Sequence, residues 1–222
     1  MDFSPNYKVI SKIEGSASIE ELSEEVGVYS ATPDFVRRTC GPIACTMLDS
    51  IPDSWFKEAR DKKLWPNFDV RVHRLYPGDF PAYPGWHCDG QYRETYFTQP
   101  KTDHVMCGRH IIGYVSSIEG VSRTEFLSQK HSLTLDSIPS QQETLWGMLD
   151  KSIESLDEYD SWELPEGNLV LFDSSTPHRA TPSKKRGWRL FFRASMWYRE
   201  NLGEGKVSRQ EHIYKLVEGS GW

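Results

Sequence analysis

The chain has 222 residues, enough for one sizeable hydrophobic core, and no linker-like stretch divides it. Its formal net charge of -6 disfavours general binding to nucleic acid and to anionic membranes. The sequence has no apolar run of about 18 residues that would predict a membrane helix, and its few cysteines form no CxxC pair. These features favour one globular domain over residues 1–222 in a reducing cytoplasm.

Two helices are predicted in the first 67 residues, which we expect to support a core at about 68–200. Residues 18–27 (SIEELSEEVG) combine a serine cap, an acidic first turn and a glycine stop. Residues 52–63 (PDSWFKEARDKK) form the second helix. Both precede the strand-rich part of the sequence, so we expect them to pack outside it.

The hydrophobic pattern changes to a period of two at Phe68, where FDVRVHRLYPGD predicts a strand. Val70 and Val72 share one face of this strand with Arg74 and Tyr76. A charged side chain that continues an apolar face usually points into a pocket or forms a salt bridge. Arg74 is therefore a candidate partner for an anion, although a buried salt bridge explains the pattern equally well.

Four further strands are predicted, at residues 109–118, 124–127, 168–173 and 189–196. Residues 139–156 are most simply read as a helix inserted between them. Strands of uneven spacing, with helices before and among them, indicate a mainly β fold with flanking helices. The strands are expected to form a closed or nearly closed antiparallel core.

A histidine and an aspartate stand two residues apart in YPGWHCDGQY, at His87 and Asp89. On a strand, residues i and i+2 point to the same side with a rise of roughly 3.3 Å per residue, so both side chains can reach one metal ion. Cys88 points the other way. Such a pair also arises by chance, so alone it leaves a metal site and an ordinary strand equally open.

A third candidate ligand comes from the segment GNLVLFDSSTPHRA. His178 follows an apolar strand there and stands in a polar loop, where a site would open. Two imidazoles and one carboxylate on one face of an ion form the 2-His-1-carboxylate set, which leaves coordination positions open for other ligands. His87, Asp89 and His178 supply that set.

Two arginines, Arg189 and Arg193, fall on the same side of the strand RLFFR, and Leu190 and Phe192 take the opposite side. In one interpretation the arginines face solvent while the apolar residues face the core. In the other, Arg189 forms a bidentate pair with a carboxylate inside the barrel, as a permanently charged planar donor can. Periodicity alone does not separate the two.

With these residues the sequence resembles the iron(II)- and 2-oxoglutarate-dependent dioxygenases, which are built on the double-stranded β-helix, a jelly-roll, cupin-like fold. The resemblance rests on RLYPGDFPAYPGWHCDG, TEFL, EGNLVLFDSSTPHRA and the arginine that follows, over about residues 68–196. It implies that His87, Asp89 and His178 hold Fe(II). It also implies that Arg189 binds the 5-carboxylate of 2-oxoglutarate and that O2 is the other cosubstrate.

Below the level of this superfamily the resemblance points in two directions. A second arginine, here Arg193, is similar to the taurine-dioxygenase branch, in which it binds an anionic group of the substrate. The short separation of Asp89 and His178 is more similar to the phytanoyl-CoA hydroxylase and prolyl hydroxylase branches. The latter similarity implies that Tyr76 lines the cosubstrate pocket, and Thr124 of TEFL is a further candidate donor.

Trp86 stands beside the ligand pair and Trp188 beside the arginine strand, so each is either a core residue or a wall of the pocket. Arg193, Arg74 and Trp86 are thus the candidate substrate-binding residues. The other histidines show no partner spacing, and we expect them on the surface or in structural hydrogen bonds. They are His73, His104, His110, His131 and His212.

The function implied by the resemblance is hydroxylation of an unactivated C–H bond of a small, anionic molecule, with release of succinate and CO2. One alternative is the same chemistry on a peptide or a nucleobase, which the acidic charge and the lack of a basic groove do not favour. Another is a cupin-like metal-binding protein, or a metal hydrolase, without oxygenase activity. Arg189 discriminates, because a hydrolase has no need to bind a dicarboxylate there.

Overall fold

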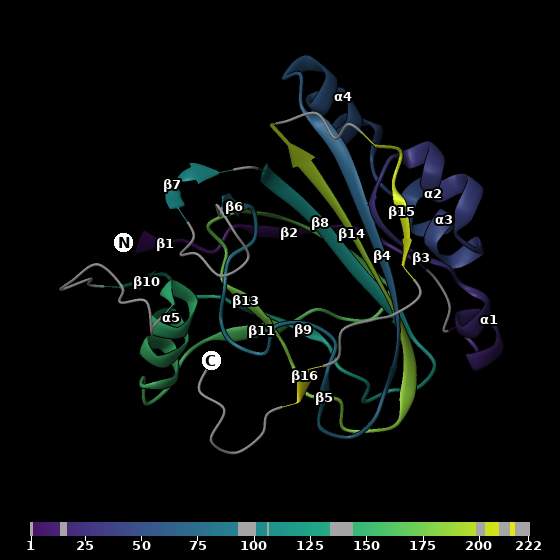
Figure 1. Ribbon diagram of the computed structural model, residues 1–222. Coiled ribbons are helices and arrows are strands. Elements are labelled where there is room, and N and C mark those ends of the chain that lie inside the picture. Colours follow the sequence, from purple (N-terminus) through teal and green to yellow (C-terminus); the bar gives the residue numbers. More distant parts are fainter. Residues whose placement is uncertain are drawn as a thin grey trace.

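The computed structural model describes residues 2–13, 17–92, 101–105, 107–133, 144–198, 203–208 and 214–215. Its largest feature is a seven-stranded antiparallel sheet (Figure 1). The strands are β2 (Tyr7–Lys12), β3 (Gly27–Ala31), β4 (Trp65–Leu75), β8 (Cys107–Ser116), β12 (Asn168–Asp173), β14 (Gly187–Trp197) and β15 (Lys206–Ser208). They lie side by side in the order β15-β3-β4-β14-β8-β12-β2.

A smaller antiparallel sheet faces the large one. It contains β9 (Thr124–Leu127), β11 (Ser161–Glu163) and β13 (His178–Ala180), in the order β11-β9-β13. A buried cluster joins the two sheets, with Ile112 and Tyr114 from β8, Val170 and Phe172 from β12, and Phe126 from β9. In both sheets most neighbouring strands are not consecutive in the sequence. Two facing antiparallel sheets connected in this way form the double-stranded β-helix, so the predicted fold is confirmed.

Three short strand pairs lie around these sheets. β1 (Asp2–Phe3) pairs with β10 (His131–Ser132), β5 (Asp79–Phe80) with β16 (Tyr214–Lys215), and β6 (Gln91–Tyr92) with β7 (Lys101–Val105).

Helices cover the outer face of the large sheet. α1 (Ile19–Glu24), α2 (Pro33–Thr39), α3 (Pro42–Asp49) and α4 (Asp53–Asp61) lie together along one side of it (Figure 1). Their apolar side chains, such as Leu22 and Met47, share one cluster with Val70, Leu190 and Phe192 of the sheet. The helices therefore cover the apolar part of this face and leave the opposite face of the sheet to line a site. Among the described residues, no helix is long and apolar enough to cross a membrane.

The first 67 residues contribute strands to the large sheet as well as the predicted supporting helices. The helix predicted at 18–27 is α1, which begins with a Ser18 capping box but ends at Glu24, so that Gly27 starts β3 instead of stopping the helix. β2 and β3 extend the large sheet, pairing with β12 and β4. Helices α2 and α3 were not predicted, although each has a proline in its first turn.

The remaining predicted elements correspond to observed ones. The strands predicted from Phe68 and at 109–118, 124–127, 168–173 and 189–196 are β4, β8, β9, β12 and β14. The predicted inserted helix is α5 (Leu145–Glu154), and residues 139–143 of that prediction lie outside the described part of the chain. α5 packs with Trp86 in a separate apolar cluster.

The two faces of β4 are reversed relative to the sequence interpretation. Val70 and Val72 pack against the helices, and their face continues to Arg74 and Tyr76, which are exposed. The prediction that Arg74 points into a pocket is therefore wrong. Arg74 lies beyond the part of this face that the helices cover, and its side chain is exposed. The opposite face, which carries Asp69, Arg71 and His73, faces the smaller sheet.

Candidate functional site

Three candidate metal ligands meet between the two sheets. The structure brings together His87, Asp89 and His178, and one ligand atom from each lies within 4.8 Å of the others. His178 begins β13 and not a loop, and it forms an antiparallel bridge with His87 through N–H to O distances of 3.0 and 2.9 Å. The backbone thus holds the two imidazoles beside each other, with ring centroids 4.6 Å apart.

Both imidazoles are oriented by main-chain carbonyl groups. His87 Nδ1 lies 2.8 Å from the carbonyl oxygen of Gly85, and His178 Nδ1 lies 3.1 Å from that of Thr176. A carbonyl oxygen can only accept, so Nδ1 carries the proton in each ring and Nε2 keeps its lone pair. This is how metal-binding histidines are prepared, and two such nitrogens with one carboxylate fit Fe(II).

Asp89 is held in its charged form by Arg193. Arg193 donates from Nη1 to Asp89 Oδ2 at 3.0 Å, and from Nε and Nη2 to Asp69 Oδ2 at 3.0 and 2.5 Å. Burial acts to raise the pKa of Asp89, but the positive charge of Arg193 outweighs it and holds that pKa well below its usual value. Because Arg193 is already paired with two carboxylates, it is a poor partner for an anion of the substrate.

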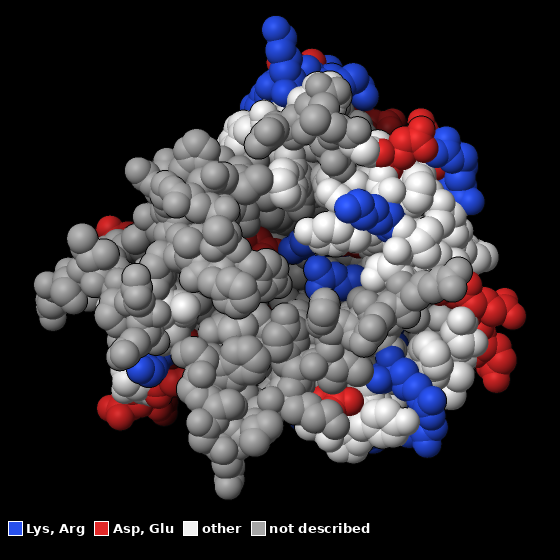
Figure 2. Space-filling model, in the orientation of Figure 1, with Lys and Arg blue, Asp and Glu red and all other residues white. Residues whose placement is uncertain are grey.

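A cavity of about 280 Å³ opens beside the three candidate ligands. Figure 2 shows basic side chains in a hollow near the centre of this face of the molecule, with acidic atoms next to them. The lining residues are Tyr29, Arg71, Pro81, Ala82, Tyr83, His87, Asp89, Ile112, Thr124, His178, Arg179, Ala180, Arg189, Phe191 and Arg193. The lining therefore combines the candidate metal ligands with four arginines.

Arg189 lines this cavity as a buried cation that has no carboxylate partner within the described residues. It is 2 % exposed, so the solvent-facing interpretation is wrong, and its Nε makes no hydrogen bond. The rings of Tyr114 and Phe191 lie 5.0 and 5.1 Å from its guanidinium carbon, and the cross-strand neighbour His73 is neutral, because burial lowers its pKa well below the usual value.

Burial also lowers the pKa of Arg189, to about 10, with a smaller contribution from the positive charge of Arg71. The guanidinium therefore stays charged at neutral pH. A buried charge without a partner is costly, so this part of the cavity favours an anion as ligand.

The other predicted site residues divide into two groups. Thr124 lines the cavity from β9. Tyr76, with 42 % of its surface exposed, lies outside the lining, and Tyr114 instead is the tyrosine beside Arg189. Trp86 is fully buried in the apolar cluster of α5, so its prediction as a substrate-binding wall is wrong.

The remaining histidines have structural contacts where the structure describes them. His110 Nδ1 lies 2.9 Å from Ser195 Oγ, and His131 Nε2 lies 2.9 Å from Ser152 Oγ. Burial lowers the pKa of His110 to about 4, so it stays neutral near Asp89. The side chain of His104 and all of His212 fall outside the described residues.

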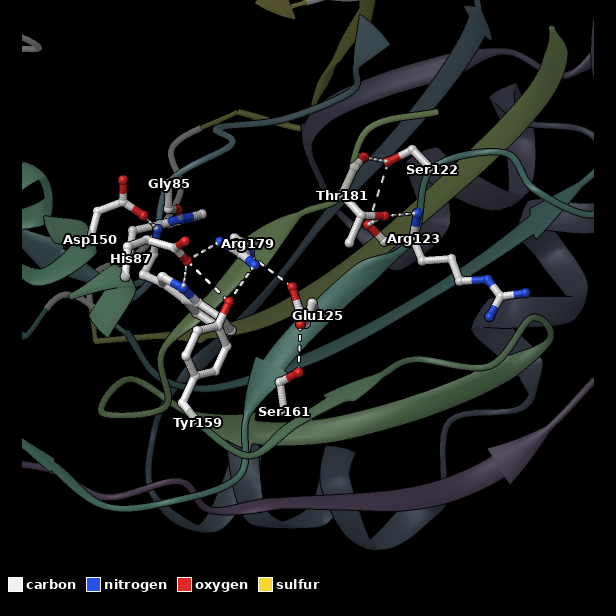
Figure 3. A network of polar contacts seen from close by, with 12 residues as sticks. Gly85, His87, Ser122, Arg123, Glu125, Asp150, Tyr159, Ser161, Arg179 and Thr181 are labelled. Atoms are coloured by element: carbon white, nitrogen blue, oxygen red, sulfur yellow. Dashed lines mark hydrogen bonds and ion pairs between the residues drawn. The ribbon is translucent and has the colours of Figure 1, made fainter. Parts of the chain in front are cut away.

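Trp86 and Arg179, which flank two of the candidate ligands, stack on each other. The guanidinium carbon of Arg179 lies 4.5 Å from the ring centroid of Trp86. Arg179 donates to Glu125 at 2.7 Å and to Tyr159 at 2.8 Å (Figure 3). Glu154 of α5 accepts from both Arg179, at 2.6 Å, and the Trp86 indole, at 3.1 Å. One network thus fastens the chain next to His87 and His178.

We predict that Arg179→Gln lowers the free energy of unfolding by about 2 kcal/mol, because it removes charge-assisted hydrogen bonds and a cation–π contact. It should also weaken metal binding about tenfold, as loss of a ligand's support does. Arg123→Gln is the matched control, since its pair with Glu163 is more exposed and should contribute about 1 kcal/mol or less. Chemical denaturation and metal titration measure both, and equal effects in the two variants would contradict the supporting role.

No family model matches this sequence, and no curated protein matches it. Solved structures with a similar chain course include a prolyl-4-hydroxylase from Pseudomonas putida, 15% identical, with a TM-score of 0.36, over 86% of this chain and 99% of that one. An N-substituted L-amino acid dioxygenase from Burkholderia ambifaria AMMD, in complex with alpha-KG, is 15% identical, with a TM-score of 0.35, over 83% of this chain and 78% of that one.

A further similar structure is the nickel complex of the non-heme monooxygenase ThoJ, 11% identical, with a TM-score of 0.32. The match covers 60% of this chain and 43% of that one, so it spans less than half the length of ThoJ. With identities and TM-scores this low, the function must be argued from the residues of this chain.

Proposed function

We propose that the chain is an Fe(II)- and 2-oxoglutarate-dependent oxygenase that hydroxylates an unactivated C–H bond of a small anionic molecule. The observation that supports this most directly is Arg189, a buried cation without a carboxylate partner among the described residues, in the same cavity as the three candidate ligands. A dicarboxylate that binds the metal with one end and Arg189 with the other satisfies both groups. A hydrolytic metal site does not require such a residue.

When bound, iron and its cosubstrates supply the oxidising chemistry, in which O2 and 2-oxoglutarate give succinate, CO2 and one oxygen atom for the C–H bond. The chain supplies the geometry. His87 and His178 offer Nε2 and Asp89 offers a carboxylate oxygen, while Arg193 fixes the orientation of that carboxylate.

Other residues of the chain bind the cosubstrate and exclude water. Arg189 binds its distal carboxylate, and Thr124 adds a hydroxyl group to the same cavity. Phe126 and Phe172 pack against the His178 ring, with centroids 5.7 and 5.0 Å away, and keep water from that side of the metal.

Anaerobic addition of Fe(II) and 2-oxoglutarate to the purified chain tests this proposal. We expect a visible charge-transfer absorption that appears only when both are present, because a chelated keto acid on iron is required for it. Fe(II) binding without this absorption would instead support a cupin-like metal-binding protein. Arg189→Ala should raise the concentration of 2-oxoglutarate needed.

We further propose that residues 1–222 act as one domain in the cytoplasm, with no nucleic acid or membrane as partner. All four cysteines are free thiols, which supports a reducing compartment. The helices of the first 67 residues share one buried cluster with β4 and β14, and a second cluster joins the large sheet to the smaller one, which supports a single folding unit.

A further inference from the structure

Arg71 is a second cation in the cavity that has no partner among the described residues. Four arginines line the cavity. Arg179 and Arg193 each pair with two carboxylates. Arg71 and Arg189 have no hydrogen bond or ion pair within the described ranges. One dicarboxylate cosubstrate accounts for Arg189 and leaves the charge of Arg71 unmatched.

We propose that Arg71 and Tyr29 form a subsite for an oxyanion of the primary substrate, such as a carboxylate, a sulfonate or a phosphate. The inference rests on the proposed function, because it divides the anions of the cavity between a cosubstrate and a substrate. It replaces Arg193 and Arg74 as substrate-binding residues, since the first is already paired and the second lies outside the cavity lining.

The register of the sheet separates Arg71 from the cosubstrate arginine. On the paired strands β14 and β4, Arg193 lies opposite Asp69, Phe191 lies opposite Arg71, and Arg189 lies opposite His73. Successive inward positions on a strand are about 7 Å apart. Arg71 is therefore one position closer to the Arg193 and Asp89 pair than Arg189 is, on the strand next to β3.

An irregularity in β3 brings Tyr29 to the same part of the cavity. The pairing of β3 with β4 shifts between Val28 and Ala31, and Ser30 within this bulge has a φ of 55°. A positive φ is uncommon for serine, and bulges often redirect a side chain next to a site. Tyr29 lines the cavity and is 50 % exposed, so its ring stands at the opening.

Asp69 ties this bulge to the metal site. It accepts from the Ser30 backbone N–H at 2.9 Å through Oδ1 and from Arg193 through Oδ2. Arg193 in turn holds Asp89. The bulge that carries Tyr29 and the candidate ligand Asp89 are thus joined by one continuous set of contacts. Arg71 lies two residues from Asp69 on the same face of β4, where a substrate that approaches the metal would meet it.

Arg71→Gln tests the subsite by binding alone, without turnover. Calorimetry measures the dissociation constants of phenylacetate and of phenylacetamide, which differ in charge and little in shape, with Mn(II) and saturating 2-oxoglutarate present. We expect the wild-type chain to prefer phenylacetate. The variant should weaken phenylacetate about tenfold, as loss of one charge-assisted partner does, and should leave phenylacetamide and 2-oxoglutarate nearly unchanged.

Two further variants keep the outcome decisive. Arg74→Gln, on the same strand but outside the lining, should change neither probe. Tyr29→Leu should weaken both probes alike, because a ring wall does not sense their charge. A wild-type chain without the charge preference, or a preference that survives in Arg71→Gln, would overturn the subsite.

The subsite would also be overturned if Arg71→Gln weakened the binding of 2-oxoglutarate and left that of phenylacetate unchanged. That result would assign Arg71 to the cosubstrate. A wild-type chain that binds no 2-oxoglutarate contradicts the proposed function instead. The two probes then still report on Arg71, so the two failures are distinguishable.

Discussion

His178→Ala should lose Fe(II)-dependent turnover of 2-oxoglutarate and most of its affinity for a divalent metal while the chain stays folded. His178 supplies one of three candidate ligand atoms, and its Nε2 keeps a lone pair for a metal because Nδ1 donates to the Thr176 carbonyl oxygen. Loss of a ligand's hydrogen-bonding partner already weakens a metal site by about 10–100-fold, so loss of the ligand itself should exceed that range. Titration with Mn(II) and an assay of succinate formation measure the two effects.

His131→Asn is the matched control for this variant. His131 is also a buried histidine with one hydrogen bond, to Ser152, but it is not part of the metal group. It should keep both metal affinity and turnover. Asp89→Ala should behave as His178→Ala does, since Arg193 retains Asp69 as a partner and the chain remains folded. Full activity in either variant would refute the assignment of the ligands.

Local rules in the sequence select the three candidate ligands, which the structure brings together. His87 and Asp89 fall on one side of an extended segment by their spacing alone, and His178 follows a short apolar run that predicts a strand. These positions depend on backbone geometry over a few residues. Their meeting is not local: the antiparallel bridge between His87 and His178 brings together residues that are far apart in the chain.

The choice between the two faces of a strand is less local. β4 carries apolar and polar residues on both faces, so periodicity does not say which one faces the cavity. The answer depends on which face the helices cover, and α2 and α3, which contribute to that cover, were not predicted. Arg74 was therefore selected in place of Arg71, although alternating Asp69, Arg71 and His73 mark a polar face on a central strand.

Arg189 and Arg193 show why a charge pattern needs its partners to be interpreted. Both face inward, as the spacing allowed, yet they have opposite surroundings. Arg193 meets two carboxylates, which raise its pKa above the usual value against the effect of burial, whereas Arg189 meets two aromatic rings and a lowered pKa. The sequence puts the two arginines on one face of a strand, and only the contacts show that Arg193 is already paired while Arg189 can receive an anion.

Arg189→Met should therefore stabilise the chain without cosubstrate and weaken 2-oxoglutarate binding on the order of 100-fold or more. Replacing an uncompensated buried charge with an apolar side chain of similar length removes a desolvation cost, by about 1–4 kcal/mol. The same change removes the proposed partner of the distal carboxylate, and truncating one partner of a buried charge pair costs about 2–5 kcal/mol of binding. The two effects have opposite signs.

Thermal unfolding with and without Mn(II) and 2-oxoglutarate measures both effects in one experiment. The wild-type chain should gain stability when both are added, in line with ligand binding to the folded state. Arg189→Met should unfold at a higher temperature than wild type when they are absent and should gain little when they are added. Arg74→Met, an exposed arginine one strand away, should leave both measurements near wild type. A structural role for Arg189 gives the reverse result, a less stable variant that still responds to 2-oxoglutarate, because its charge would then be satisfied within the chain.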